Sequence, residues 1–386
     1  MADNFDDFVE RVRDANPIED VLEESGIHLR GHGRMRTATK HDSLKVRIDF
    51  QRAWWYSQNW NGDVFGWIMR EKSVEFFEAL NILARRANIE MPNLSRVNES
   101  EVKRNRATAD VFSAAANVFH RWLNGDKERE LKPDPDALAY ALGRGWSYET
   151  INESLLGFSG RKTAEQVKDM RGEFDLYGID HLCPAAVAVM GFQGDIEGWA
   201  TKYDILDEVR AEGWIEKGRI HGLMDTPGLI YAHQHRGGVN YLSRRQLPGH
   251  DKIKDRDWKS FNPHKLLVGP KQAYWNHAVR IDKPLVCVEG QGDAITFGQW
   301  GQGSMAFCGL LGDPAHIAPE DGERMRRMAA RINKHPAVYL ALDNDEAGNK
   351  AEHLAAKLLG PKIQILRMSH TWTREDAAAA KESVDA

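Results

Sequence analysis

The chain has 386 residues, of which 42% are hydrophobic and 28% are charged, and its formal net charge is −5. This composition is typical of a folded globular protein and excludes both a disordered chain and a surface that is basic throughout. At roughly 150 residues per domain, the length accommodates two or three domains. With this net charge, any contact with nucleic acid would have to come from a local cluster of lysine and arginine.

The cysteines and the N-terminus indicate the compartment. Cys183, Cys287 and Cys308 are scattered and form no Cys-x-x-Cys pair, which suits a reducing environment. The N-terminus is acidic and lacks an apolar signal segment, and no run of about eighteen apolar residues occurs. We expect a cytoplasmic protein without a membrane partner.

The first 92 residues predict a small antiparallel sheet between helices. Apolar residues recur at helical spacing at both ends of this segment, and short aromatic-rich runs lie between them. The expected helices cover residues 5–13, 17–25, 64–70 and 76–88, and the expected strands cover 28–36, 45–50 and 53–56.

Basic residues interleave with tryptophans in this segment, a composition typical of surfaces that bind single-stranded nucleic acid. The candidate contacts are Arg34, Arg36, Lys45 and Arg47. The tryptophans have two interpretations, because they can form a core or stack with bases. We expect about half of them in the core; the sequence does not say which. They are Trp54, Trp55, Trp60 and Trp67.

The middle of the chain carries weaker signals. Residues 93–106 are polar and charge-rich, which is typical of a linker, and residues 161–226 are the least informative. The expected helices cover 111–123, 137–143 and 205–213, and the expected strands cover 187–190 and 199–203. Residues 228–245 predict a hairpin of two strands around an Arg-Gly-Gly turn.

Two matching segments mark the C-terminal third. Each is a short apolar run that ends in carboxylates, Glu289 in the first and Asp343 with Asp345 in the second. Strands at 304–310 and 362–368 and helices at 319–333 and 346–359 complete an alternating pattern. Because the carboxyl ends of parallel strands meet at one edge, these acids are expected close together. Oxygen ligands of this kind suit a hard divalent cation.

These residues resemble the Toprim domain shared by DnaG-type primases, topoisomerases and some nucleases. The motifs are Val288-Glu289-Gly290 with Asp293, then Asp343-Asn344-Asp345 with Ala347-Gly348, and Arg374-Glu375-Asp376 resembles the last acidic motif. The resemblance implies that Glu289, Asp343 and Asp345 are catalytic and bind Mg²⁺ or Mn²⁺, with Asp293 as a further metal ligand and Asp376 as an accessory acid. The alternative is an ordinary doubly wound sheet with surface acids at its strand ends.

The first 92 residues resemble the zinc-ribbon domain of the same primases, from the first helices to the Asn61-Gly62-Asp63 turn. The family carries Cys-x-x-His and Cys-x-x-Cys where this chain has Ala38-Thr-Lys-His41 and Ser57-Gln-Asn-Trp60. Structural zinc needs four nitrogen or sulfur ligands, so we expect no zinc and an aromatic cluster instead. Two other histidines, His28 and His32, do not complete a recognisable ligand pattern with His41.

The core of the chain resembles these primases more locally. Residues 140–151 resemble the helical start of the primase core, and the hairpin over 228–245 resembles one that ends in arginine. The resemblance implies that four basic residues contact nucleotide and template: Arg244, Arg245, Lys259 and Lys271. The alternative for each is a solvated charged surface.

The expected fold is α+β and multi-domain, with a small antiparallel N-terminal module, a helical and mixed subdomain, and an α/β Toprim fold with a central parallel sheet. The expected boundaries are 1–92 for a zinc-less template-binding module, 93–106 for a linker, 107–275 for the N-terminal part of the polymerase core and 276–386 for the Toprim domain. The resemblance implies a DNA primase, of a phage or mobile element, that makes RNA primers on single-stranded DNA from nucleoside triphosphates. A separate replicative helicase is the expected protein partner. A Toprim nuclease and a catalytically inactive primase-like replication protein are the alternatives.

Overall fold

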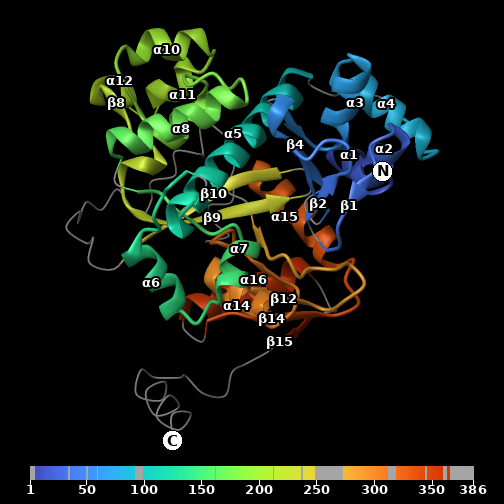
Figure 1. Cartoon of the computed structure of the whole chain (residues 1–386). Helices are drawn as coiled ribbons and strands as arrows, with labels where there is room; N and C mark the ends of the chain where they lie inside the picture. The colour runs from blue at the N-terminus through green and yellow to red at the C-terminus, as the bar shows by residue number, and fades with distance from the viewer. Residues whose placement is uncertain are drawn as a thin grey trace, which may run out of the picture. The chain divides into compact units, whose positions relative to one another are not determined.

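The structure of the protein is a computed structural model. It describes residues 5–33, 35–48, 51–58, 60–91, 99–127, 129–160, 162–211, 213–235, 238–247, 273–311, 319–343, 346–359 and 363–365. The chain forms two compact units, residues 1–271 and 272–386, drawn together in Figure 1. In the described part, no helix is both long and apolar enough to cross a membrane.

The N-terminal module confirms the expected sheet between helices. Its helices are α1 (Phe5–Asp14), α2 (Ile18–Glu24), α3 (Val64–Lys72) and α4 (Phe76–Arg86). Its antiparallel sheet has the order β1 (Leu29–Arg30), β2 (Met35–Ala38), β3 (Leu44–Arg47), β4 (Arg52–Trp55), β5 (Trp60–Gly62). The last of these strands was not expected from the sequence. Phe8, Leu22, Val46 and Phe65 are fully buried between the sheet and the helices.

Helix α5 (Glu99–Asn124) is the longest helix of the described residues and contacts both strands and helices of the first unit. It begins at Glu99, inside the range that reads as a linker in the sequence. It packs on a sheet of order β10 (Gly238–Gln246), β9 (Gly228–His235), β6 (Gly157–Phe158). The backbone of Gly157 lies so close that a Cβ there would come within 2.7 Å of the Phe119 Cβ. The Ser113 hydroxyl accepts a hydrogen bond from the Val239 N–H at 2.9 Å.

A group of short helices packs beside α5. It contains α6 (Pro135–Gly143), α7 (Tyr148–Glu153), α8 (Ala164–Leu176), α9 (Pro184–Met190), α10 (Ile196–Lys202), α11 (Leu206–Ala211) and α12 (Trp214–Lys217), with β7 (Phe192–Gln193), β8 (Arg219–Ile220) and the 3₁₀ turn η3 (Leu223–Asp225). The prediction of strands over 187–190 and 199–203 was wrong, because these segments belong to the helices α9 and α10. Pro184 at the first turn favours a helix, and the Asp195 side chain caps α10 by accepting the Gly198 N–H.

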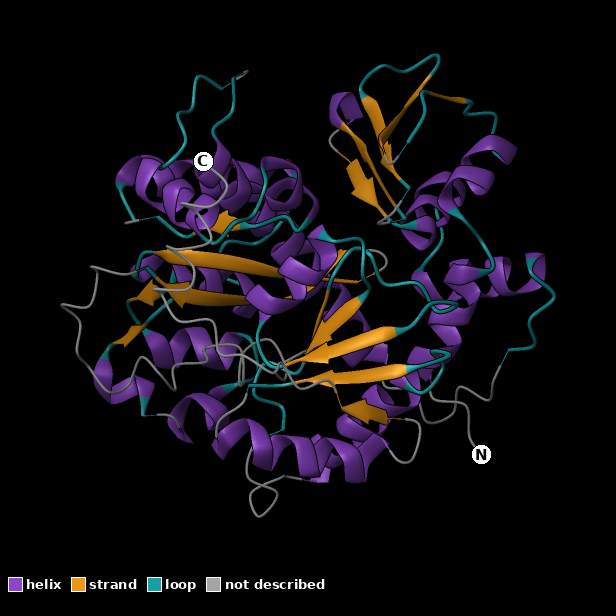
Figure 2. Ribbon diagram, turned by 90° about the horizontal axis from the view of Figure 1, so that it is seen from below, coloured by secondary structure: helices purple, strands orange, loops and turns teal. Residues whose placement is uncertain are grey.

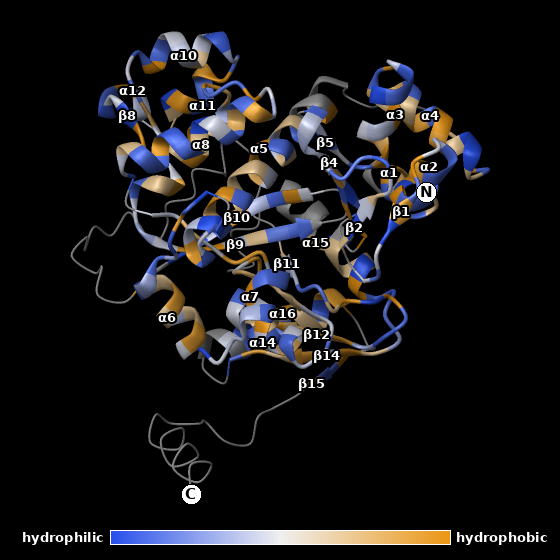
Figure 3. Ribbon diagram, in the orientation of Figure 1, coloured by the Kyte–Doolittle hydropathy of each residue, from blue (hydrophilic) through white to orange (hydrophobic). Residues whose placement is uncertain are grey.

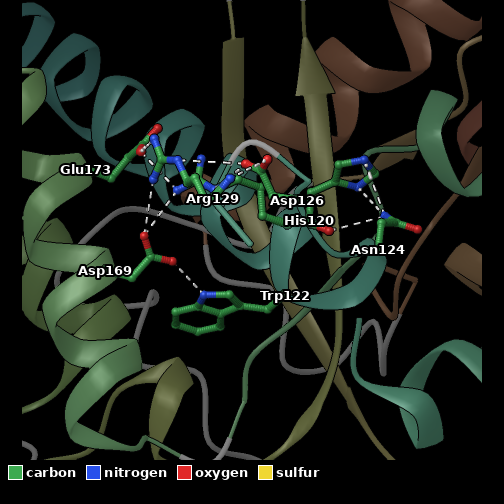
Figure 4. Close-up of polar contacts among 8 residues, drawn as sticks. His120, Trp122, Asn124, Asp126, Arg129, Asp169 and Glu173 are labelled. Carbon is green, nitrogen blue, oxygen red and sulfur yellow. Dashed lines mark hydrogen bonds and ion pairs between the residues drawn. The ribbon is translucent and has the colours of Figure 1, made fainter. Parts of the chain in front are cut away.

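Polar side chains connect α8 to α5 and to the loop that follows α5. The indole N–H of Trp122 donates to Asp169 at 2.7 Å, and Arg121 donates to the buried Glu173 at 2.9 Å. Arg129 reaches both acids, as Figure 4 shows. The cluster joins two helices and a loop through charge-assisted hydrogen bonds. Its charged groups therefore have a structural role.

The second unit contains the predicted parallel sheet. Its order is β11 (Tyr274–Trp275), β13 (Ser304–Ala306), β12 (Leu285–Val288), β14 (Val338–Ala341), β15 (Ile363–Ile365), and only β11 is antiparallel. The helices are α14 (Gln291–Gln299), α15 (Pro319–Ile332) and α16 (Glu346–Leu359). Figure 2 shows the strands side by side among these helices.

Alternate residues of each strand face opposite layers. Leu285 and Cys287 join a core with residues of α15 and α16. On β13, Ser304 instead donates its hydroxyl hydrogen to the Ala294 carbonyl of α14 at 3.1 Å. Figure 3 shows apolar residues concentrated on the central strands. Helices therefore cover both faces of the sheet, and its carboxyl-terminal edge carries the loops that hold the acids.

Candidate active site and nucleic-acid interface

The predicted acids lie at the carboxyl-terminal edge of the parallel sheet. In the register, Val288 of β12 pairs with Ala341 of β14. Glu289 comes directly after Val288, and Asp343 comes two residues after Ala341. Two carboxylates that are 54 positions apart in the sequence are thus brought to the ends of neighbouring strands.

Tight backbone packing fixes the position of Asp343. Gly348 lies in the first turns of α16 and is buried, and an added Cβ would come within 1.9 Å of the Asp343 carbonyl oxygen. Contacts below 3.0 Å with backbone atoms cannot be relieved by a side-chain rotation. The Asp-x-Asp-x-x-Gly spacing therefore has a steric reason, since the helix after the acids sits directly on the Asp343 backbone.

Asp293 lies close to the same strand end. It is exposed in the first turn of α14, where a carboxylate is favoured by the helix dipole. One of its oxygens would lie 3.1 Å from a Cβ added at Gly290, the residue after Glu289. Glu289 itself is half-buried, and its carbonyl accepts the Cys308 N–H at 3.0 Å.

The donor set suits a hard cation such as Mg²⁺ or Mn²⁺, because every candidate ligand is a carboxylate. Within the described ranges, no group of three or more His, Cys, Asp or Glu side chains lies close enough to hold a metal ion. Two of the predicted acids, Asp345 and Asp376, lie outside those ranges. Glu289, Asp293 and Asp343 are therefore placed at one edge by the fold, and their joint metal ligation stays a prediction.

The two hairpin arginines have different surroundings. Arg244 is half-buried and donates to the backbone carbonyls of Leu223 and Thr226 at 2.9 and 3.2 Å. Burial lowers the pKa of its guanidinium to about 10, so it is still charged at neutral pH. Arg245 is exposed on the other side of β10. Arg244 therefore fastens the hairpin to η3, whereas Arg245 is accessible to a ligand. Lys259 and Lys271 lie outside the described residues.

The N-terminal sheet separates its tryptophans by face. Trp67 is buried, and its ring lies 6.1 Å from that of Trp55 and 5.6 Å from that of Trp60. Arg70 covers both outer rings, at 5.2 and 5.6 Å from their centroids. Trp54 alternates to the opposite face of β4 and pairs across the sheet with Lys45.

The positions of the family's zinc ligands lie in or beside this ring cluster. Ala38 is buried, the His41 ring lies 5.1 Å from that of Trp55, and Ser57 shares a hydrogen bond of 2.6 Å with Ser43. Packed rings and one hydroxyl pair thus stand where the family holds a metal. His28 is exposed beside Glu23, 3.9 Å away, and His32 is also exposed.

Arg36, Lys45 and Arg47 are half-buried on β2 and β3, and Arg34 lies outside the described residues. Lys45 donates to the Thr37 hydroxyl at 3.2 Å. The register places Lys45 and Arg47 on one face with Trp54, whereas Arg36 points to the other. The expected basic and aromatic surface is therefore smaller than the sequence indicated.

A buried ion network joins this module to α5, and no local pattern in the sequence indicates it. Asp63 caps α3 and lies 3.2 Å from Arg13 and 3.3 Å from Arg106 of α5. One helical turn later, Asp110 accepts from Arg52 of β4 at 2.7 Å. Helix α5 thus pairs Arg106 with an acid of the module and, one turn later, Asp110 with an arginine of the module.

The fold defined by these units is an α+β chain in which a small antiparallel module precedes a mixed core and a parallel sheet with acids at its carboxyl-terminal edge. The solved structure of the Aquifex aeolicus primase, comprising zinc-binding and RNA polymerase domains, has this fold. It matches 98% of this chain and 85% of that chain with a TM-score of 0.50 and 16% identity. The expected fold class is therefore confirmed.

Sequence comparison points to the same group of proteins. The chain is 24% identical over 371 residues to the DNA primase of Pseudomonas aeruginosa, covering 92% of this chain and 49% of the relative. It is 24% identical over 365 residues to the DNA primase of Deinococcus radiodurans, covering 92% and 55%. The chain thus spans about half the length of the curated relatives it matches. No protein-family model matches it. The resemblance to DnaG-type primases that the motifs indicated is confirmed.

Proposed function

We propose that the chain is a DNA primase that makes short RNA primers on single-stranded DNA by metal-dependent nucleotidyl transfer. The observation that carries this proposal is the placement of Glu289 and Asp343 at adjacent strand ends, with Gly348 packed against the Asp343 backbone. The likeness to bacterial DNA primases over 92% of the chain supports it.

Divalent metal ions bound by these carboxylates would lower the pKa of the attacking hydroxyl and offset charge on the leaving phosphate. Glu289 and Asp343 would hold the ions, with Asp293 and Asp345 completing the ligand set. Arg245 is an exposed strand residue, and its planar guanidinium could donate two hydrogen bonds to phosphate oxygens. Lys259 and Lys271 share the proposed role in nucleotide and template binding.

The N-terminal module is proposed to contact the template through Lys45, Arg47 and Trp54, which share one sheet face, with Arg34 and Arg36 as further basic contacts. We propose that this module needs no zinc, since packed rings stand at the positions of the ligands. Nucleoside triphosphates as substrates, a replicative helicase as partner, a cytoplasmic location and an origin in a phage or mobile element follow from the resemblance and belong to the same proposal.

The test is primer synthesis on mixed-sequence single-stranded DNA with labelled nucleoside triphosphates, with and without Mg²⁺ or Mn²⁺. Glu289→Gln and Asp343→Asn should each abolish metal-dependent products. Asp282→Asn is the matched control, because Asp282 is an exposed acid just before β12, at the opposite end of the same strand. The control should retain full activity.

Two other outcomes would replace this proposal. Shortening of the DNA, dependent on the same two acids, would identify a Toprim-type nuclease. Binding of DNA without synthesis or cleavage would identify an inactive replication protein, which the absent zinc ligands would then explain.

A further inference from the structure

A cavity of about 220 Å³ opens in the part of the chain whose sequence is least informative. It is lined by Lys162, Gly191, Phe192, Gln193 and Arg219. Strands β7 and β8 form its wall, since Gln193 and Arg219 are direct partners in their antiparallel register. Side chains directly opposite in such a pair lie on the same face, so an amide and a guanidinium stand side by side here.

One buried carboxylate positions the cations of this cavity. The Asp225 side chain is 3% exposed, and it lies 2.6 Å from the Lys162 ammonium and 3.1 Å from the Arg219 guanidinium. Its second oxygen accepts the Gly222 N–H at 2.8 Å and lies 3.5 Å from the His221 ring. The two cations are thus held in fixed positions before any ligand arrives, which reduces the entropy cost of binding.

The charge of the cavity is positive. The side chains of Lys162 and Arg219 are 31% and 45% exposed, so both charged groups still reach solvent. Burial, followed by the charge of Arg219, lowers the pKa of His221, which is therefore neutral at pH 7. Lys162 and Arg219 thus pair with one carboxylate, and the charge of Arg244 also acts on Asp225, so positive charge is in excess.

Close backbone packing builds the floor of the cavity. A Cβ at Gly222 would come within 2.1 Å of the Gly191 nitrogen, and a Cβ at Gly191 would come within 2.8 Å of an Asp225 oxygen. Gly191 also has φ +75°, a conformation that favours glycine. The ion pairs are therefore part of a packed site. By contrast, the Arg210–Glu197 pair on α11 and α10 is half-exposed at both partners.

We propose that this cavity binds one phosphate group of a single-stranded nucleic acid. A phosphodiester carries one negative charge, which the excess positive charge around Asp225 attracts. Lysine and arginine donate charge-assisted hydrogen bonds to phosphate oxygens, and the Gln193 amide can add a neutral donor. The inference rests on the proposed function for the nature of the ligand, and it adds a contact that is far in sequence from the acids and lies next to η3, to which Arg244 is bonded.

The experiment measures binding of a dT oligonucleotide by fluorescence anisotropy between 50 and 200 mM KCl. Each phosphate contact on a single strand adds about 0.7 to the slope of log K against log salt. Arg219→Gln should lower the slope by about 0.7 and weaken binding several-fold for any sequence. Arg210→Gln removes the same charge from the same helical region outside the cavity, and it should leave the slope unchanged. An unchanged slope in Arg219→Gln would overturn the proposal.

A second variant separates binding from structural support. Asp225→Asn keeps an acceptor for the Gly222 N–H and removes the charge that competes with the phosphate for Lys162 and Arg219. The loss of this competition should outweigh the loss of the fixed positions of the two cations, so the variant should tighten oligonucleotide binding two-fold or more. If the ion pairs serve only the fold, both variants should weaken binding in step with a lower unfolding temperature, and the proposal fails. Inorganic phosphate and ATP, tested as competitors, distinguish free phosphates from a strand. If phosphate or ATP displaces the oligonucleotide while the salt slope of Arg219→Gln is unchanged, the cavity does not bind a strand and the proposal fails.

This measurement is independent of catalysis. A chain that binds the oligonucleotide through Arg219 but makes no primers would retain the inference and lose the proposed primase activity. If the chain makes primers but the slope is unchanged in Arg219→Gln, the proposed primase activity stands and the inference fails.

Discussion

The N-terminal module and the parallel-sheet unit place their charged groups in opposite ways. In the module, Asp63 is 4% exposed and paired with two arginines, and its ring cluster stands where the family holds zinc. In the sheet unit, Asp343 is exposed at the rim, and the core beneath it is apolar. Buried charged groups thus add to the apolar core of the module, whereas the sheet unit keeps its acids apart from its core.

This difference separates acids that affect activity from acids that affect folding. An acid at a strand end can be exchanged with little loss of stability, because it does not hold the strands together. A buried acid such as Asp63 cannot, because its removal takes a carboxylate partner from Arg106 and from the buried Arg13, which would then depend on Glu10. Substitutions in the module should therefore act first on stability, and substitutions at the sheet edge should act first on activity.

The largest expected effect comes from breaking the buried ion network. Asp63→Ala should lower the free energy of unfolding by about 3–5 kcal/mol, since an uncompensated buried charge is strongly destabilising. Asp42→Ala is the control, because Asp42 is 78% exposed and pairs with Arg30 at the surface. It should cost less than about 1 kcal/mol. Urea unfolding measures both, and equal losses would contradict the contrast.

The ring cluster gives the next comparison, between Trp67 of α3, which packs with Trp55 and Trp60, and Trp54, which lies on the opposite face of β4. Trp67→Ala should cost about 3–5 kcal/mol, because it removes a buried ring that contacts two others. Trp54→Ala should cost little stability but weaken binding of single-stranded DNA, since a stacked base contributes about 1–3 kcal/mol. Thermal unfolding measures the loss of stability, and fluorescence anisotropy measures the loss of DNA binding. A large loss of stability in Trp54→Ala would place that ring in the core.

At the sheet edge, Gly348→Ala should reduce primer synthesis by about 100-fold, because the added methyl group must displace the Asp343 backbone. Gly172→Ala provides the control, since a Cβ at this position on α8 meets nothing within 4 Å. That control should stabilise the chain by about 0.5–1 kcal/mol. Loss of activity in Gly348→Ala with its fold retained, shown by circular dichroism, would support the positioning role.

Acid should also affect the module first. Burial alone would raise the pKa of Asp63, but the charges of Arg106 and Arg13 together with the Gly66 N–H hold it well below its usual range. Because the folded pKa is depressed, the stability from this group is complete above about pH 4–5, the range of an unfolded aspartate, and is lost as pH falls further. Asp63→Asn should show a weaker dependence on pH between about pH 2 and 5. An unchanged profile would show that the network is not the acid-sensitive element.

The sequence predicted those parts of the fold that depend on local pattern. β12 and β14 are short apolar runs bounded by turns, and they were found at the expected places with Glu289 and Asp343 at their ends. The helices over 187–190 and 199–203 were missed, because short apolar runs do not distinguish a strand from a buried helix. Pro184 and Asp195 were the available signals.

Other features depend on tertiary contacts that no local pattern contains. Asp63 and Arg106 are 43 positions apart, and Lys162 and Asp225 are 63 apart. Each pair is an ordinary acid and base in the sequence, and burial alone makes it important. The candidate site could therefore be predicted where it follows strand ends, but the network and the phosphate cavity could not.

Metal removal should have the smallest effect on stability, and it gives the sharpest contrast between the two regions. Incubation with EDTA should abolish primer synthesis, because the carboxylates at the sheet edge can no longer neutralise the reacting phosphates through bound cations. The unfolding temperature of the N-terminal module should not change, because rings and ion pairs hold it. Hydrogen exchange at β3 and β4 reports on the module alone. Faster exchange there after chelation, reversed by zinc but not by Mg²⁺, would show that the module holds a metal after all. Equal exchange with lost activity would confine the metal requirement to the region of Glu289 and Asp343.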